Sequence, residues 1–493
     1  MKQQPNILMI MTDQQRFDTL QAVYPGAWGQ KESLTPNLDR LARESTVFTN
    51  AYTPSPVCAP ARAAIKTGVY PPGCGVVTNW VDFKDTKLDF LPAVLQKQGY
   101  DTGLVGKLHF TPADGDFGFR FRRLNDAPYS VYADDDKNSD YIRWLREFSF
   151  DKKGIDPVSL FDADESAFDS NLEQFIAGSG FRTQEEHDIP WVVRNSQEFL
   201  EEKREKPYFL FASFFGPHQP YLPPEPWCSL VKPESVVLPE NFEAQMEHNP
   251  IFMQVARCGA AARRMRSTFT KQDYQRLIAY NLGQIAMLDA YIGQLLDTVR
   301  RSGEWDNTIV VFLSDHGDHL GSYGLFFKGD MYDSCCKVPL FMKVPGVPAQ
   351  IFSKNVNTLD TYATLLELAG DVSFRDNPVL ESRSLVNLLH GDSSDWDDET
   401  YSIYGENPET ALCMLKSGSM KLIRLGCGEG EALYELYDLA ADPAETQNRW
   451  EDAALAGIRS ELRKKLDSWY LRQAKAYPKT LVRHNKAEQV EQE

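Results

Sequence analysis

The chain has 493 residues, of which 42% are hydrophobic and 25% charged, as in globular proteins with one large domain or several smaller ones. Its 52 basic and 70 acidic side chains give a formal net charge of −18. That balance argues against a nucleic-acid-binding protein, which needs a basic face, but it is compatible with a small anionic substrate held by a few local cations.

The N-terminal stretch and the apolar runs give no sign of a membrane segment. Residues 7–11 form a five-residue apolar run, which is too short for the core of a signal peptide. No run approaches the roughly 20 apolar residues of a membrane-spanning helix. The sequence as written therefore predicts a cytoplasmic protein with no membrane partner, or a periplasmic or secreted one if a leader has been removed.

Four short apolar runs, each followed directly by polar residues, predict buried strands. They cover residues 5–11, 99–106, 207–215 and 307–314. Nearly continuous apolar runs of this length are typical of strands that are covered on both faces of a mainly parallel sheet.

Helical patterns lie between these runs. They cover residues 34–45, 88–99 and 270–303. Thr35 is the expected N-cap of the first, with Pro36 at its first helical position, and Gly303 is the expected C-cap of the longest. The alternation predicts an α/β fold with a large, mainly parallel sheet sandwiched by helices.

The remaining segments suggest how the chain is divided. Residues 115–200 are polar and irregular, and we interpret them as an insertion that shapes a substrate cleft, with a solvated loop at 132–140. From about residue 391 the pattern changes to short antiparallel strands and turns, followed by a helix at 453–476 and a polar tail at 484–493. We expect a catalytic domain at 1–390 and a smaller α+β subdomain at 391–493, whose helix and tail could contact a second subunit.

Two of the predicted strands are followed by possible metal ligands. Asp13 and Gln14 come after the first strand, and Asp315 and His316 come after the last. In sheets of this kind, ligands bind beyond the carboxyl ends of the strands. Two carboxylates, an amide oxygen and an imidazole suit Ca²⁺, Mg²⁺ or Mn²⁺ better than a zinc–thiolate site. The alternative is that these residues are helix caps and turn formers.

Cationic side chains follow the same strands or lie near them. Lys107, His109, His218 and Lys328 would add positive charge and proton-transfer capacity at one edge of the sheet. Each of them alone could be an ordinary surface or hydrogen-bonded residue. Together with a metal they would form a site for an oxyanion such as a sulfate or phosphate group.

Cys58 is the cysteine whose surroundings need an explanation. The eight cysteines form no C-x-x-C pair, which argues against a zinc or redox motif, and Cys335 and Cys336 are expected to be structural. Pro60 is expected to begin a helix, with Cys58 at its N-terminus and Arg62 one turn along. Such a cysteine could be a thiolate with a lowered pKa, but a thiolate is a poor ligand for a hard cation.

The segment Cys58-Ala59-Pro60-Ala61-Arg62 matches a C-x-P-x-R signature. Further matches are "PNILMIMTDQQR", "SFFGPHQPYLPP", "SDHGDHLGSYGLFFKG" and the C-terminal "ELYDLAADPAETQN". With these motifs the chain resembles the type I sulfatases of the alkaline phosphatase superfamily, whose signature cysteine is converted to formylglycine by a formylglycine-generating enzyme. The resemblance extends over nearly the whole chain.

The resemblance implies a role for each matching residue. Formylglycine at Cys58 would be the nucleophile and a metal ligand, in the form of a hydrated aldehyde. The other implied metal ligands are Asp13, Gln14, Asp315 and His316, with Ca²⁺ as the first choice and Mg²⁺ or Mn²⁺ as alternatives. Arg62 and Lys107 would hold the modified residue, Lys328 and His218 would contact the sulfate, His218 would protonate the leaving oxygen, and His109 would act as a base.

Three positions depart from the commonest family pattern. Gln14 and His316 stand where many sulfatases have an aspartate and an asparagine, and Tyr323 replaces a residue that is often histidine. Similar substitutions occur in the branch that contains phosphonate monoester hydrolases and choline-sulfatase-like enzymes, in which Asn79 would also line the site. The expected function is hydrolysis of a carbohydrate, alkyl or aryl sulfate, and the alternatives are a phosphonate monoester or phosphodiester hydrolase and a non-catalytic relative.

Overall fold

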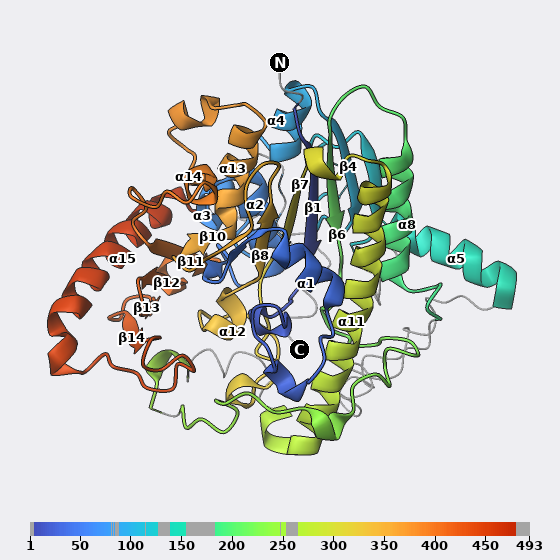
Figure 1. Ribbon diagram of the computed structural model, residues 1–493. Helices are drawn as coiled ribbons and strands as arrows, with labels where there is room; N and C mark the ends of the chain where they lie inside the picture. Colours follow the sequence, from blue (N-terminus) through green and yellow to red (C-terminus); the bar gives the residue numbers. More distant parts are fainter. Residues whose placement is uncertain are drawn as a thin grey trace.

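The computed structural model describes residues 4–79, 81, 83, 88–113, 115–126, 139–153, 183–246, 248–252 and 265–479. Its centre is an eight-stranded sheet in the order β5-β4-β6-β1-β7-β8-β2-β9 (Figure 1). In that order the strands are Phe121–Leu124, Asp101–Gly106, Tyr208–Ser213, Asn6–Thr12, Thr308–Ser314, Leu340–Lys343, Thr46–Phe48 and Gln350–Phe352.

The sheet is mainly parallel, which confirms the expected fold class. All neighbours from β5 to β7 run parallel, and β8 is antiparallel to both β7 and β2. The four predicted strands are β1, β4, β6 and β7, which lie together in the middle of the sheet. Because β1 and β7 are in register from Asn6↔Thr308 to Thr12↔Ser314, the residues that follow both strands emerge at the same edge.

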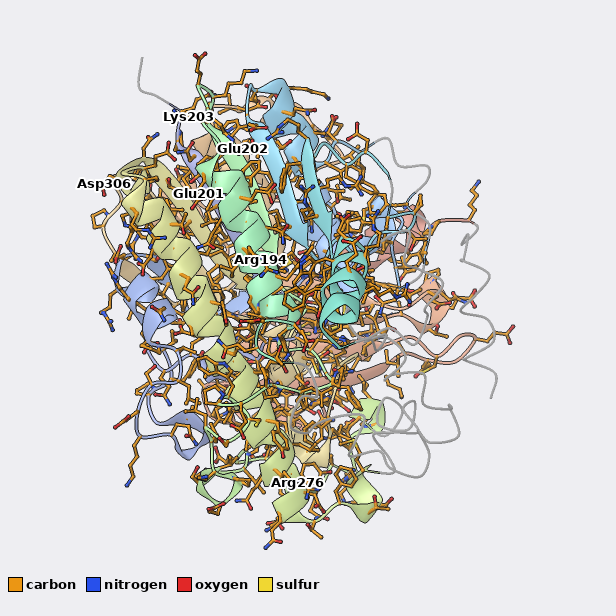
Figure 2. All side chains as sticks on the ribbon, turned by 90° about the vertical axis from the view of Figure 1, so that its right-hand side faces the viewer. Arg194, Glu201, Glu202, Lys203, Arg276 and Asp306 are labelled. Atoms are coloured by element: carbon orange, nitrogen blue, oxygen red, sulfur yellow. The ribbon has the colours of Figure 1, made fainter. Side chains whose placement is uncertain are left out.

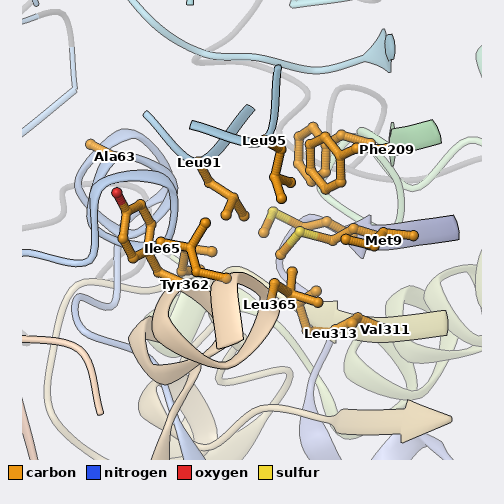
Figure 3. Close-up of a cluster of buried hydrophobic side chains, with 14 of the residues drawn as sticks. Met9, Ala63, Ile65, Leu91, Leu95, Phe209, Val311, Leu313, Tyr362 and Leu365 are labelled. Carbon is orange, nitrogen blue, oxygen red and sulfur yellow. The ribbon is translucent and has the colours of Figure 1, made fainter. Parts of the chain in front are cut away.

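One face of the sheet is covered by α2, α4 and α13. These helices span Cys58–Thr67, Leu91–Lys97 and Thr361–Leu368. Met9 of β1 packs on this side with Phe209, Val311 and Leu95 (Figure 3), and all four side chains are almost completely buried. Alternate residues of a strand point to opposite faces, so Leu8 and Ile10 contribute to the core on the other side.

The other face of the sheet is covered by α1, α8 and α11. These helices span Pro36–Arg43, Asp188–Glu201 and Lys271–Arg301. The helices α8 and α11 lie side by side, with Arg194, Glu201 and Lys203 on the outer surface of the molecule (Figure 2). The sheet is therefore sandwiched between two helical layers, as expected for this α/β pattern.

The ends of three helices can be compared with the sequence expectations. Thr35 is the N-cap of α1 with Pro36 next to it, as predicted. The cap of α11 is Ser302 rather than Gly303, and Gly303 follows it with φ +78°, the left-handed conformation that glycine adopts without strain. Helix α2 begins at Cys58, two residues before Pro60, because proline fits equally well inside a first helical turn.

The interpretation of residues 115–200 as an insertion needs correction. The segment contains β5, α5 (Asp140–Lys153) and α8, and β5 and α8 belong to the main sheet and its helical layer. Apolar residues at helical spacing in α8, such as Trp191 and Phe199, are buried among polar neighbours that obscured the pattern. Most of the predicted loop at 132–140 lies outside the described residues, as do 154–182.

The C-terminal part forms the expected α+β subdomain. Its four-stranded antiparallel sheet consists of β11 (Glu399–Tyr404), β12 (Leu412–Ser417), β13 (Met420–Leu425) and β14 (Leu433–Asp438). Helix α15, Ala456–Ala476, packs on this sheet through Leu462, Leu466 and Trp469. The division at residue 390 stays a prediction, and the tail at 484–493 lies outside the described residues.

Shorter elements connect these parts. They are β3 (Ala51–Tyr52), β10 (Val356–Asn357), α3 (Pro71–Cys74), α12 (Asp333–Cys336) and α14 (Val386–Leu389). Among the residues that the structure describes, none of the helices has both the length and the apolar character needed to cross a bilayer.

A buried ion cluster joins the C-terminal sheet to the main domain. The ammonium of Lys421 on β13 lies 2.8 Å from Asp333 Oδ1 and 2.7 Å from Glu445 Oε1, and its side chain is 0% exposed. Replacing Lys421 with methionine would leave two buried carboxylates without their cation. We expect the free energy of unfolding to fall by about 3–5 kcal/mol, measured by denaturant unfolding.

The control for this prediction is Lys465→Met on the surface of α15. Lys465 also contacts two carboxylates, those of Glu399 and Glu461, but its side chain is 39% exposed. Water screens such pairs, so the expected loss is below about 1 kcal/mol. Equal losses for the two variants would show that the buried cluster does not stabilise the junction.

Candidate functional site

The predicted metal ligands lie together at one edge of the sheet. Asp13 and Gln14 directly follow β1, and Asp315 and His316 directly follow β7, the parallel neighbour of β1. Gln14 has φ +64°, and its backbone N–H donates to Asp315 Oδ1 over 3.0 Å. All four residues are at most 1% exposed, so they form one buried polar group rather than separate surface turns.

Arg62 links the two carboxylates. Its Nε donates to Asp315 Oδ2 over 2.7 Å, and a terminal nitrogen donates to Asp13 Oδ2 over 3.1 Å. The other terminal nitrogen donates to the carbonyl of Lys107 and to Ser213 Oγ. The guanidinium is fully buried, and although burial lowers its pKa, Asp315 and Asp13 raise it further, so it stays charged. Arg62 therefore fixes the positions of both carboxylates.

Lys107 reaches the same carboxylate from the end of β4. Its Nζ donates to Asp13 Oδ2 over 2.6 Å and lies 4.6 Å from the centroid of the Phe215 ring. The chain can turn here because Gly106 has φ +102°, and a Cβ at that position would lie 1.7 Å from the carbonyl oxygen of Ser213. Burial and Cys58 raise the pKa of Asp13, but Lys107, His218 and Arg62 lower it more, so the net pKa lies below the usual range.

The arrangement of donor atoms fits a divalent cation. One ligand atom each from Asp13, Cys58, Asp315 and His316 lies within 4.8 Å of the others. His316 Nδ1 is 2.9 Å from the carbonyl oxygen of Gly317, to which it donates, so Nε2 faces the carboxylates at 3.6 and 3.7 Å. Burial and Lys328 lower the pKa of His316, but Asp315 and Cys58 raise it more, so the net pKa lies above its usual value. In its neutral form the His316 ring would offer an Nε2 lone pair beside two carboxylate oxygens, and ligand atoms that converge in this way suit a divalent cation.

Cys58 begins α2 and lies in the middle of this site. Its Sγ is 3.1 Å from His316 Nε2, 3.0 Å from Lys328 Nζ and 3.6 Å from Asp13 Oδ1. Burial raises the pKa of the Cys58 thiol, but Lys107, Lys328 and His316 lower it more, and the net pKa lies well below the usual range. The position of the Cys58 side chain therefore stabilises a negatively charged group.

The remaining predicted cations surround the same side chain. His109 and His218 each form a hydrogen bond with the side chain of Cys58. His218 Nδ1 lies 2.5 Å from the carbonyl oxygen of Gln219, which leaves Nε2 for that contact. Burial lowers the pKa of both histidines, with a further contribution from Lys328 at His218 and from Lys107 at His109. Burial therefore favours the neutral form of both rings.

Two further predicted residues lie close by but make other contacts. Asn79 Oδ1 accepts a hydrogen bond of 3.0 Å from the backbone N–H of Ala59, so it caps the first turn of α2 next to Cys58. Tyr323 has φ +57°, and its hydroxyl donates to the carbonyl of Ala444 over 3.0 Å, which ties its loop to the C-terminal part. Cys335 and Cys336 are buried, and burial is the main cause of their raised pKa, which fits a structural role.

Several residues that support the site were not singled out from the sequence. Asp126 Oδ1 accepts hydrogen bonds from the backbone N–H groups of Leu108 and His109, and so holds His109 at φ +59°. Asp318 and Gln219 contact the side chain of Gln14. Asp318 belongs to the quoted "SDHGDHLG" motif, so the sequence indicated that it lies near the site. Its contact with Gln14, 304 residues away, could not be predicted from the motif.

Comparisons with known proteins show the family to which the chain belongs. The family model described as sulfatase matches residues 5–372, and the one described as N-sulphoglucosamine sulphohydrolase, C-terminal, matches residues 321–472. An arylsulfatase of Clostridium perfringens is 30% identical over 466 residues, which is 90% of each chain. A choline-sulfatase of Rhizobium meliloti is 28% identical and covers 91% of this chain and 83% of its own.

A solved structure extends the comparison to the fold. The phosphonate monoester hydrolase of Agrobacterium radiobacter superposes with a TM-score of 0.78 at 24% sequence identity. The match covers 95% of this chain and 96% of that one. At this identity the likeness concerns the fold, which both proteins share almost from end to end.

Proposed function

The chain belongs to the sulfatase family, and we propose that it releases sulfate from an organic sulfate ester by means of a formylglycine made from Cys58 and a divalent cation. The observation that carries this proposal is the convergence of Cys58 with two carboxylates, three histidines and two lysines in one buried site. A sulfate ester is a tetrahedral anion, and a buried site with this many cationic groups favours such a substrate.

The proposed cation would be held by Asp13, Gln14, Asp315 and His316. Ca²⁺ is the first choice because most of these ligands are oxygens, and Mg²⁺ and Mn²⁺ are alternatives. The sulfur of Cys58 is a poor fifth ligand for such a hard ion, whereas the oxygen of a formylglycine fits it. The proposal therefore includes a formylglycine-generating enzyme as a partner during maturation.

When present, the formylglycine would supply an oxygen nucleophile, and the divalent cation would supply positive charge next to it. Arg62 and Lys107 would hold the modified residue, Lys328 and His218 would contact the sulfate oxygens, and Asn79 would line the substrate side of α2. His218 would act as the acid in its doubly protonated form: Nδ1 donates to the carbonyl oxygen of Gln219, and Nε2, which faces Cys58, would give its proton to the leaving oxygen. His109, a neutral ring, would accept a proton from the nucleophile as sulfate is released.

The natural substrate is proposed as a sulfated carbohydrate or a small alkyl or aryl sulfate. The match to the C-terminal model named after N-sulphoglucosamine sulphohydrolase favours a carbohydrate. Parts of the segments expected to contact it, 127–138, 154–182 and 253–264, lie outside the described residues. We retain the division into a catalytic domain at 1–390 and a C-terminal subdomain at 391–493 as part of this proposal.

A second candidate function is hydrolysis of phosphonate monoesters or phosphodiesters. The observation that favours it is Gln14, which contributes a neutral amide where many sulfatases have an aspartate. A ligand set with one negative charge fewer leaves a more positive site, and the two classes of ester differ in the charge that develops on the transferred group.

A comparison of rates separates these candidates. We expect kcat/KM to be higher for an aryl sulfate than for the matching aryl phosphonate monoester, measured on protein whose Cys58 peptide is shown by mass spectrometry to carry formylglycine. A strong preference for the phosphonate would overturn the sulfatase proposal in favour of the second candidate. Failure to hydrolyse either ester in the modified form would indicate a non-catalytic relative.

A further inference from the structure

The side-chain amide of Gln14 has two chemically different ends, and only one of them can face a cation. Its Oε1 carries lone pairs, whereas its Nε2 carries two hydrogens and no available lone pair. A carboxylate at this position would offer an oxygen in either orientation. A site that uses glutamine instead needs a device that fixes which end of the amide faces inward.

The contacts of Gln14 define that orientation. Nε2 donates to Asp318 Oδ2 over 2.5 Å and to Gln219 Oε1 over 2.7 Å, while Oε1 accepts from Lys328 Nζ over 2.7 Å. Reversing the amide would place its oxygen against the carboxylate of Asp318 and its NH₂ group against the ammonium of Lys328. Both contacts would then be repulsive, in a buried place where water cannot screen them.

Asp318 is itself held in place by the fold. It is 1% exposed, and its Oδ1 accepts hydrogen bonds of 2.9 Å from the backbone N–H groups of Leu320 and Phe327. Its Oδ2 also accepts from the hydroxyl of Tyr221 over 2.6 Å. All four hydrogen-bond partners of the Asp318 carboxylate are donors, so each of its two oxygens has to be an acceptor.

We propose that Asp318 is a positioning residue that orients the Gln14 amide, so that its carbonyl oxygen faces the cation site and Lys328. The inference rests on the proposed function, because that function makes Gln14 a metal ligand. Asp318 would act on the cation only through Gln14. The segment from Asp315 to Lys328 would thus have three roles. Asp315 would bind the cation, Lys328 would bind the sulfate or phosphonate group, and Asp318 would orient Gln14, the ligand that follows β1.

The test is the substitution Asp318→Asn, which keeps the shape of the side chain. The two backbone N–H groups need the remaining oxygen, so the new NH₂ group points at Gln14. The Gln14 amide then reverses and turns its NH₂ group toward the cation site. We expect the affinity for Ca²⁺, titrated calorimetrically into chelator-treated protein, to fall by about 10- to 100-fold.

A second substitution inverts the polarity of the pair. In Gln14→Glu combined with Asp318→Asn, the amide at position 318 donates to one oxygen of the new carboxylate at position 14, and the other oxygen faces the cation. Asp318→Asn should therefore lower Ca²⁺ affinity when residue 14 is glutamine and raise it when residue 14 is glutamate. A double-mutant cycle measures this change of sign, which a merely structural role of Asp318 would not produce.

Tyr221→Phe is the matched control, since it removes another donor to the same oxygen but leaves the acceptor for Gln14. It should keep the wild-type affinity for Ca²⁺. Wild-type affinity in Asp318→Asn, or the same loss in both backgrounds, would overturn the orientation inference while leaving the metal centre standing. A wild-type protein that takes up none of Ca²⁺, Mg²⁺ and Mn²⁺ would instead overturn the metal centre of the proposed function, and this inference with it.

Discussion

Replacing Cys58 with alanine is expected to lower turnover of an aryl sulfate by at least about 10⁴-fold, because the side chain that provides the nucleophile is lost. The cations around position 58 would still bind the substrate. The side chains of Asp13, Asp315 and His316 keep their positions through Arg62 and the backbone. Metal content and thermal unfolding should therefore remain close to those of the wild type, while the rate falls.

Cys413→Ala provides the comparison for this variant. Cys413 is also a fully buried free cysteine, but it lies on β12 in the C-terminal sheet, in the hydrophobic cluster that contains Leu462 and Trp469. Its loss should reduce stability through a small cavity and leave the activity per folded molecule unchanged. Substantial activity in Cys58→Ala would show that the nucleophile has been assigned to the wrong residue.

Much of the site was predictable because its residues follow buried strands. The apolar runs that became β1 and β7 are long enough to be recognised, and in a parallel sheet their ends meet at one edge. Asp13 and Asp315 could therefore be placed together although they are 302 positions apart in the sequence. The signature at Cys58 then supplied the third part of the site, which the structure brings to within 3.6 Å of Asp13.

Short elements and pairwise contacts could not be predicted in the same way. The strands β2, β8 and β9 have only three or four residues, and such runs have no recognisable period. Helix α8 was missed because the polar composition of its surroundings concealed its buried face. The contact between Gln14 and Asp318 depends on rotamers and loop geometry, which no pattern of residue types along the chain specifies.

Asp315→Asn is expected to abolish cation binding and, with it, turnover. Both oxygens of Asp315 are already used, Oδ2 by Arg62 Nε and Oδ1 by the backbone N–H groups of Gln14 and His316. An asparagine has only one oxygen, so its NH₂ group must oppose either the guanidinium or the two N–H groups. The loss of charge and this conflict together should lower metal affinity by at least about 100-fold, measured by calorimetric titration of Ca²⁺.

Asp289→Asn separates this effect from the general cost of removing a buried carboxylate. Asp289 on α11 is 1% exposed and accepts hydrogen bonds from the backbone N–H groups of Asn37 and Leu38 at the start of α1. The same substitution there should lower stability, because a helix N-terminus loses a negative partner, and should leave Ca²⁺ affinity unchanged. If Asp315→Asn binds Ca²⁺ as tightly as Asp289→Asn does, then the cation is held elsewhere, and the residues at the ends of β1 and β7 have another purpose.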